Sequence, residues 1–140
     1  MRPVFHYSFP VHDLELAERF YVEVLGGRVG RRRESWIDIL IWGQQLTLQL
    51  RPDEVLAAEA QGVRHFGVIL EWSEWERVVA RLQAAGVEWL VPPQVRRAGE
   101  PDEQGKLYLA DPSGNVLEIK TYRDLEATFG AGAFEPDAAS

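Results

Sequence analysis

The sequence contains no cysteine. Disulfides, thiolate nucleophiles and zinc–thiolate sites are therefore excluded, and the absence agrees with a reducing compartment. The N-terminus also lacks a charged stretch followed by an apolar core and a small-residue cleavage site, and no apolar run approaches the roughly 20 residues of a membrane helix. We therefore expect a cytoplasmic protein that is neither secreted nor inserted into a membrane.

Positive charge is also scarce. The 15 Lys and Arg residues are outnumbered by 22 Asp and Glu residues, which leaves a net charge of −7. Affinity for nucleic acid depends on clustered Lys and Arg that displace counterions, so this balance argues against a nucleic-acid partner. The one basic run, at residues 28–33, is short, and we interpret it as a solvent-facing strand.

The two halves of the chain repeat one pattern. In each half, a strand that carries a histidine leads into an amphipathic helix that ends at a glycine, at nearly the same interval: His6 to Gly26, and His65 to Gly86. Three more strands follow in each half. The pattern predicts two βαβββ modules within a single domain, because 140 residues are enough for one ordinary core.

The repeat also sets the expected boundaries. Module one covers residues 4–50, a linker follows at 51–62, module two covers 63–122, and the Ala- and Gly-rich tail at 123–140 is expected to fray. The fold class is therefore α+β. The two modules are expected to form a curved mixed sheet with the helices outside, on the face that carries the bulky apolar residues.

Local signals predict where individual elements begin and end. Asp13 is expected to cap the first helix, and Ser73 with Glu76 forms a capping box at the start of the second. Residues 92–105 are rich in Pro, Gly and charge, and predict a loop long enough to act as a lid over a cleft. An Asp-Pro-Ser-Gly turn at residues 111–114 predicts that the last two strands form a hairpin.

Three side chains within this pattern point to chemistry. Glu118 lies between Leu117 and Ile119, where a carboxylate is costly unless it is solvated, paired or bound to a metal. His6 and His65 share with Glu118 the strand phase opposite the apolar residues, so all three are expected to face the concave side of the sheet. Two histidines and one carboxylate form the facial triad that binds Fe(II) and related ions.

Each of the three has a plainer interpretation when it is taken alone. A single histidine in a strand is more often a hydrogen-bonded structural residue than a metal ligand. Glu118 alone would be interpreted as a surface carboxylate paired with Lys120. The coincidence of residue type, strand phase and position in the repeat favours a metal cleft.

Three stretches carry a family resemblance: Val-His-Asp-Leu-Glu-Leu-Ala-Glu-Arg-Phe-Tyr-Val-Glu-Val-Leu-Gly at 11–26, Arg-His-Phe-Gly at 64–67 and Asp-Pro-Ser-Gly-Asn-Val-Leu-Glu at 111–118. Together they resemble the vicinal oxygen chelate superfamily, which contains glyoxalase I, methylmalonyl-CoA epimerase, extradiol dioxygenases, fosfomycin-resistance enzymes and bleomycin-resistance proteins. The resemblance extends from Val4 to Tyr122. It implies a divalent metal ion, Fe, Mn, Ni, Co or Zn, bound by His6, His65 and Glu118.

One position departs from the family pattern. Where glyoxalase I and the epimerase have a fourth ligand, Glu or Gln, this chain has Thr47, although a register shift to Gln49 would restore an amide ligand. A site with three ligands is more similar to those of dioxygenases and fosfomycin enzymes. In such a cleft we expect Tyr108 to act as a catalytic acid or orienting donor. Substrate contacts are expected from Trp36, Gln45, Thr47, Gln49 and Arg96.

The resemblance implies a metal-dependent enzyme, of the dioxygenase or the lyase/transferase type, whose metal chelates adjacent oxygens of a small organic substrate. The alternative is a metal-free protein of the bleomycin-resistance type that sequesters a small aromatic ligand. Five tryptophans and the acidic charge suit a cationic aromatic molecule. A scaffold with a vestigial site is the third interpretation. In each case, exposed sheet edges favour a homodimer.

Overall fold

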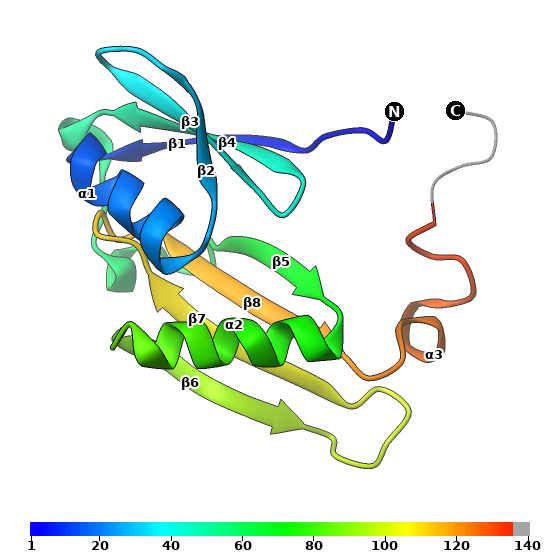
Figure 1. Cartoon of the computed structure of the whole chain (residues 1–140). Coiled ribbons are helices and arrows are strands. Elements are labelled where there is room, and N and C mark those ends of the chain that lie inside the picture. Colours follow the sequence, from blue (N-terminus) through cyan, green and yellow to red (C-terminus); the bar gives the residue numbers. More distant parts are fainter. Residues whose placement is uncertain (136–140) are drawn as a thin grey trace.

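The computed structural model describes residues 1–135 and contains two four-stranded sheets with helices packed on them (Figure 1). The N-terminal sheet consists of β1 (His6–Val11), β2 (Arg28–Arg32), β3 (Trp36–Ile41) and β4 (Gln44–Leu50), in the order β1-β4-β3-β2. The C-terminal sheet consists of β5 (Phe66–Leu70), β6 (Trp89–Arg96), β7 (Gln104–Ala110) and β8 (Val116–Tyr122), in the order β5-β8-β7-β6. The same order in both sheets confirms the predicted α+β fold of two βαβββ modules.

In each sheet the first strand of the module lies at the edge and runs parallel to the last. β1 pairs with β4, with His6 opposite Gln45, and β5 pairs with β8, with Gly67 opposite Glu118. The remaining neighbours are antiparallel. In the residues described, no ladder of hydrogen bonds joins the two sheets, so β1 and β5 each keep one unpaired edge.

The first helix begins where the sequence predicts. Asp13 accepts a hydrogen bond from a backbone N–H of the first turn at 2.9 Å, and α1 (Leu14–Glu18) continues as a π-helical stretch, Arg19–Val24. The chain leaves the helix at Gly26, whose φ of +88° suits glycine and strains other residues. The wider π-helical turn places two consecutive aromatic residues in the core.

The second helix, α2 (Trp72–Ala84), begins earlier than predicted. The capping box at Ser73 was wrong, because the N-cap residue is Glu71, whose side chain makes no capping bond, and Ser73 lies within the first turn. The first turn of the helix is instead anchored to the C-terminal sheet by a side-chain hydrogen bond. The indole N–H of Trp75 donates to the backbone oxygen of Ile119 at 2.9 Å. A tertiary contact therefore replaces the local signal.

The predicted loop at residues 92–105 was wrong at both ends. β6 continues through two consecutive prolines to its end, and β7 begins at Gln104, so the connection shortens to residues 97–103. Proline is tolerated there because β6 is an edge strand, where a missing N–H breaks no ladder. The lid that the sequence predicts is in the structure a short hairpin loop.

The tail that the sequence predicts to fray contains α3 (Leu125–Phe129) in the part that the structure describes. Phe129 packs against Tyr122 at the end of β8 and against Phe134, with ring centroids 4.9 and 5.2 Å apart. Residues 136–140 of the tail lie outside the described residues. Throughout the described part of the chain, every helix is too short or too polar to cross a membrane.

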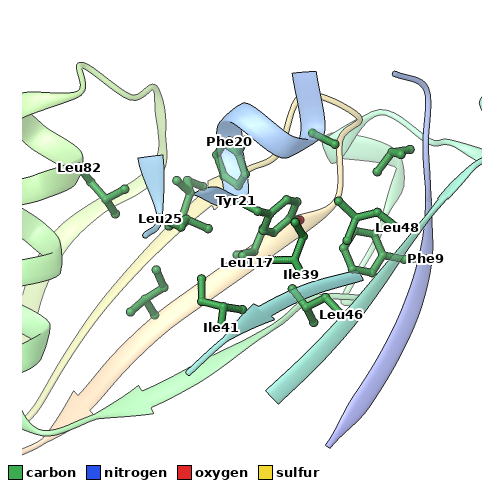
Figure 2. Close-up of a cluster of buried hydrophobic side chains, with 14 of the residues drawn as sticks. Phe9, Phe20, Tyr21, Leu25, Ile39, Ile41, Leu46, Leu48, Leu82 and Leu117 are labelled. Atoms are coloured by element: carbon green, nitrogen blue, oxygen red, sulfur yellow. The ribbon is translucent and has the colours of Figure 1, made fainter. Parts of the chain in front are cut away.

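The two modules share one hydrophobic core (Figure 2). Its members come from the apolar faces of both sheets and from the helices; Figure 2 shows Leu117 of β8 among Tyr21 and Ile39 of the first module. Burial of this apolar surface is the main favourable term in folding. Because both apolar faces contribute to this core, the polar faces of the two sheets are directed away from it.

A buried hydrogen-bond network joins the modules at one end of the core. The Tyr21 hydroxyl donates to Asp111 Oδ2 at 2.8 Å. Asp111 also accepts from the backbone N–H groups of Ser113 and Asn115. The Asn115 side-chain amide donates in turn to the backbone oxygen of Pro10 at 2.9 Å. The Phe-Tyr and Asp-Pro-Ser-Gly-Asn motifs thus join the first helix and first strand to the last hairpin.

Tyr21→Phe is expected to lower the free energy of unfolding by about 1.5–3 kcal/mol, because it leaves a buried carboxylate short of one hydrogen bond. Urea titration followed by circular dichroism measures the change. Tyr7→Phe is the matched control: Tyr7 is partly exposed and its hydroxyl makes no hydrogen bond within residues 1–135, so its removal is expected to have little effect. Equal effects of the two substitutions would contradict the role of the Tyr21 bond.

Thr121 on β8 is fully buried, and its hydroxyl has no hydrogen-bond partner among the described residues. Thr121→Val removes that hydroxyl while keeping the branched shape, and is expected to raise the free energy of unfolding by about 1 kcal/mol. Thr47→Val is the control, since the Thr47 hydroxyl donates to Asp38 at 2.9 Å and its loss is expected to destabilise. Urea titrations that show both substitutions destabilising would overturn this expectation.

Candidate functional site

The polar face of the C-terminal sheet is built around Glu118. Tyr108 and Glu118 lie opposite each other on β7 and β8, and the neighbouring Glu118 carboxylate contributes to the raised pKa of Tyr108. The Lys120 ammonium lies 3.2 Å from Glu118 Oε1. The ring of His65 meets the ring of Tyr108 edge-on, with centroids 5.3 Å apart. Glu118 is only 8% exposed, so these partners rather than water compensate its charge.

Two backbone features position these side chains. Gly67 on β5 lies so close to β8 that a Cβ atom there would come within 1.6 Å of the Glu118 carbonyl oxygen. Glycine alone allows this approach, which explains the Arg-His-Phe-Gly motif. His65 Nδ1 donates to the backbone oxygen of Val63 at 2.8 Å, because a carbonyl only accepts. In the neutral ring Nε2 is then unprotonated and suited to bind a metal ion.

A pocket of about 490 Å³ lies beside these residues. Its polar lining consists of Gln44, at the start of β4, and of His65, Glu118 and Lys120. Its apolar lining comes from β5, the segment before β1 and the C-terminal tail, and includes Phe5, Val68, Ile69 and Phe134. A pocket of this size with a few convergent polar groups suits a small organic molecule.

His6 does not join this group. It is the first residue of β1, exposed on the polar face of the N-terminal sheet, whereas His65 and Glu118 belong to the C-terminal module. In residues 1–135, no three His, Asp or Glu side chains come close enough to hold one metal ion. One chain therefore places two of the three predicted ligands together and the third elsewhere.

The polar face of the N-terminal sheet is organised around a second buried carboxylate, Asp38, which is 2% exposed. The Thr47 hydroxyl donates to Asp38 Oδ1 at 2.9 Å, and the Arg31 Nε–H donates to Oδ2 at 2.6 Å. Burial alone would raise the pKa of Asp38, but these two hydrogen bonds and a third from Gln45 outweigh it and hold the pKa below its ordinary value. Asp38 is therefore an anion at neutral pH.

The residues predicted to contact substrate are divided between the two sheets. Gln49 donates to the Ser8 hydroxyl at 3.0 Å, and the Trp36 ring lies 4.9 Å from the Arg31 guanidinium. Arg96 is exposed at the end of β6, on the other sheet. The four that share the polar face of the N-terminal sheet are Trp36, Gln45, Thr47 and Gln49.

Arg31 is the residue of this face that sequence reasoning missed, because the whole basic run was interpreted as solvent-facing. The signal that would have identified it is Asp38. A carboxylate between Ile37 and Ile39 requires a partner, and the basic run is the nearest source of cations in the sequence.

The environment of Tyr108 determines its protonation state. Desolvation, together with the hydrogen bond and the charge of Glu118, raises the pKa of Tyr108 to about 12. At neutral pH Tyr108 is therefore a neutral phenol and not a phenolate. A phenol is the form that an acid or orienting donor requires, and this catalytic role of Tyr108 stays a prediction.

Comparison with known proteins identifies the family to which the sequence is similar. Residues 4–119 match the family model of the Glyoxalase/Bleomycin resistance protein/Dioxygenase superfamily. Among solved structures, the chain is similar to a glyoxalase/bleomycin resistance protein/dioxygenase from Alicyclobacillus acidocaldarius, with 30% identity, coverage of 91% of this chain and 96% of that chain, and a TM-score of 0.81. A comparison with curated proteins found no match.

Two further solved structures share the fold. The fosfomycin resistance protein FosX from Listeria monocytogenes is 17% identical, with 91% of this chain and 98% of that chain covered and a TM-score of 0.70. A virulence protein from Salmonella typhimurium is 24% identical, with 87% and 98% covered and a TM-score of 0.59. At these identities the likeness concerns the fold alone.

Glu118→Gln is expected to lower the pKa of Tyr108 from about 12 toward its ordinary value, because the neighbouring negative charge is lost while burial persists. Nuclear magnetic resonance titration of the Tyr108 ring signals, assigned by their absence in Tyr108→Phe, measures this pKa. Glu15→Gln, on α1, is the control and is expected to leave it unchanged. An unaltered Tyr108 titration in Glu118→Gln would disprove the coupling.

Proposed function

Because the chain belongs to the Glyoxalase/Bleomycin resistance protein/Dioxygenase superfamily, we propose that it is a divalent-metal-dependent enzyme that chelates adjacent oxygens of a small organic substrate. We further infer that two chains share each metal site, with His65 and Glu118 from one chain and His6 from its partner. The observation that carries the proposal is the placement of two donors on one polar face, beside a pocket, and of the third on the other polar face.

The donors occupy comparable places in the two modules. His6 begins the edge strand β1, and His65 directly precedes the edge strand β5. Both edges are unpaired within the described residues, and both polar faces are directed away from the shared core. A twofold homodimer that sets the N-terminal polar face of one chain beside the C-terminal polar face of the other would therefore assemble all three donors twice.

The donor set suits a divalent ion such as Fe, Mn, Ni, Co or Zn, because two imidazoles and one carboxylate leave coordination positions open. Bound there, the ion would supply a Lewis acid or an oxygen-activating centre for the chelated substrate oxygens. The chain's own residues orient the ligands: the Val63 carbonyl fixes the His65 ring, and Tyr108 lies opposite Glu118 on the neighbouring strand. The same phenol is the proposed donor to a substrate oxygen.

The residues at and near the fourth ligand position, Thr47 and Gln49, favour a site with three protein ligands. The Thr47 hydroxyl is already bonded to Asp38 at 2.9 Å, and the Gln49 amide to Ser8 at 3.0 Å, so neither is directed to a metal as a further ligand. A three-ligand site is more similar to those of dioxygenases and fosfomycin enzymes than to that of glyoxalase I. We therefore propose dioxygenase or lyase/transferase chemistry.

Metal content tests the proposal. The purified chain, loaded anaerobically with Fe(II) or with Mn(II), is expected to retain metal in stoichiometric amount through gel filtration. His6→Ala, His65→Ala and Glu118→Ala are each expected to abolish that retention, as measured by elemental analysis, because each removes one of three donors. His12→Ala is the control, since His12 is bonded to Ser113 and not to the site. Unchanged metal in the three donor variants would refute the metal site.

Mixing variants tests whether two chains share the site. When His6→Ala chains are refolded together with Glu118→Ala chains, each heterodimer has one site with all three donors, so metal binding is expected to return in part. His65→Ala mixed with Glu118→Ala is the matched control, because these donors belong to the same half of a site and no heterodimer has a complete set. Recovery in both mixtures, or in neither, would contradict the shared arrangement.

A metal-free protein of the bleomycin-resistance type, which binds a small aromatic ligand, is the second candidate. The Lys120 ammonium favours it, because at 3.2 Å from Glu118 Oε1 it already neutralises the carboxylate that a metal would need. A chain that retains no metal after loading but binds a cationic aromatic dye, detected by tryptophan fluorescence, would support this candidate. Oxygen uptake by the Fe(II)-loaded chain would instead support a dioxygenase.

A further inference from the structure

We propose that Arg31 is an oxyanion-binding residue and that the substrate of this protein carries a carboxylate, phosphonate or phosphate group. The assignment of that group to a substrate rests on the proposed function. The anion site itself rests on the N-terminal sheet alone, where Arg31 shares the polar face with Asp38, Gln45 and Thr47.

The backbone of β2 directs Arg31 toward Asp38. Pairing between β2 and β3 is irregular between Val29 and Arg32, which marks a β-bulge. A bulge bends the strand and re-aims a side chain. Gly30 packs against Leu40 and Asp38, since a Cβ atom at Gly30 would be 3.3 Å from Leu40 Cγ and 3.4 Å from Asp38 Cβ.

The guanidinium of Arg31 is positioned by a hydrogen bond to Asp38 along one edge and by the Trp36 ring against one face. Its Nε–H donates to Asp38 at 2.6 Å, and its carbon lies 4.9 Å from the centre of the Trp36 ring. Asp38 is a fixed anchor because it is buried and its other oxygen accepts from Thr47. The Arg31 side chain is 63% exposed, and within residues 1–135 its two terminal nitrogens have no hydrogen-bond partner. These N–H groups are a preorganised fork for two oxygens of an anion.

This pair differs from the surface ion pairs of the chain. Arg51, for comparison, contacts two carboxylates that are themselves exposed, and such pairs order their side chains little. Here the carboxylate is fixed inside the sheet and only the cation reaches solvent. A second guanidinium, that of Arg33, lies 5.8 Å from the centre of the same Trp36 ring.

The position of Arg31 sets the expected distance between the anionic group of the substrate and its chelating oxygens. β3 and β4 separate β2 from β1, so Arg31 lies about three strand spacings, or roughly 14 Å, from the strand of His6, and its long side chain shortens this distance. The anionic group is therefore expected about 10 Å from the chelating oxygens of the substrate. The uncharged Gln45 and Thr47 line the space between them.

Inorganic phosphate is the probe, added to chelator-treated protein at constant ionic strength. In a proton–nitrogen correlation spectrum, the Nε–H signal of Arg31, identified by its loss in Arg31→Lys, is expected to shift in a saturable way with phosphate. Arg31→Lys keeps the charge but loses the fork, and is expected to weaken phosphate affinity by calorimetry at least about tenfold. The net charge of −7 disfavours unspecific anion binding, so saturation reports a site.

Arg32→Lys is the matched control, because Arg32 lies on the same strand but pairs with Glu18, and phosphate affinity is expected to be unchanged. A missing or unsaturable shift in the wild type, or equal weakening by both substitutions, would overturn the proposal. A purely structural Arg31 would not sense phosphate. Since the probe needs no metal, phosphate binding without metal retention would uphold the anion site while refuting the metal-dependent function.

Discussion

The buried hydrogen bond between Tyr21 and Asp111 is the constraint on which the arrangement of this chain depends. It joins α1 of the first module to the last hairpin of the second, and Asn115 extends the connection to Pro10 on β1. With the modules held in this way, their apolar faces meet in one core. The polar faces of the two sheets are consequently directed outward. They carry the candidate functional residues, apart from Arg96, which is exposed at the end of β6.

This outward orientation explains why one chain does not bring the three predicted metal donors together. His65 and Glu118 are ready on one face, where Gly67 allows β5 to approach β8, while His6 lies on the other face beside an open sheet edge. In the proposed homodimer, the same step that covers the open edges completes the site. Assembly and metal binding are then coupled, because neither polar face has a full ligand set alone.

Each polar face contains one buried carboxylate, Asp38 or Glu118, whose charge must be compensated by neighbouring groups. The two carboxylates differ in what they present to solvent. Burial makes each depend on its partners: Asp38 on Arg31, and Glu118 on Lys120 and Tyr108. Glu118 opens onto a pocket, so a bound cation can replace Lys120 as its partner. Asp38 is enclosed, and what it offers to solvent is the cation that it holds. In the two proposals, one carboxylate binds a ligand, and the other positions a residue that binds one.

The sequence by itself determined the elements and their order, because strand alternation, the Asp13 cap and the repeated histidine-to-glycine spacing are local properties of the chain. It also showed that Glu118 needs a partner. It was wrong at the Ser73 capping box, where the contact from Trp75 to the sheet outweighed the local signal, and at the ends of the 92–105 loop, where pairing of β6 with β7 extends both strands. Only the tertiary structure decided which side chains meet. Strand phase determines the face on which His6 lies, but packing between modules determines where that face points.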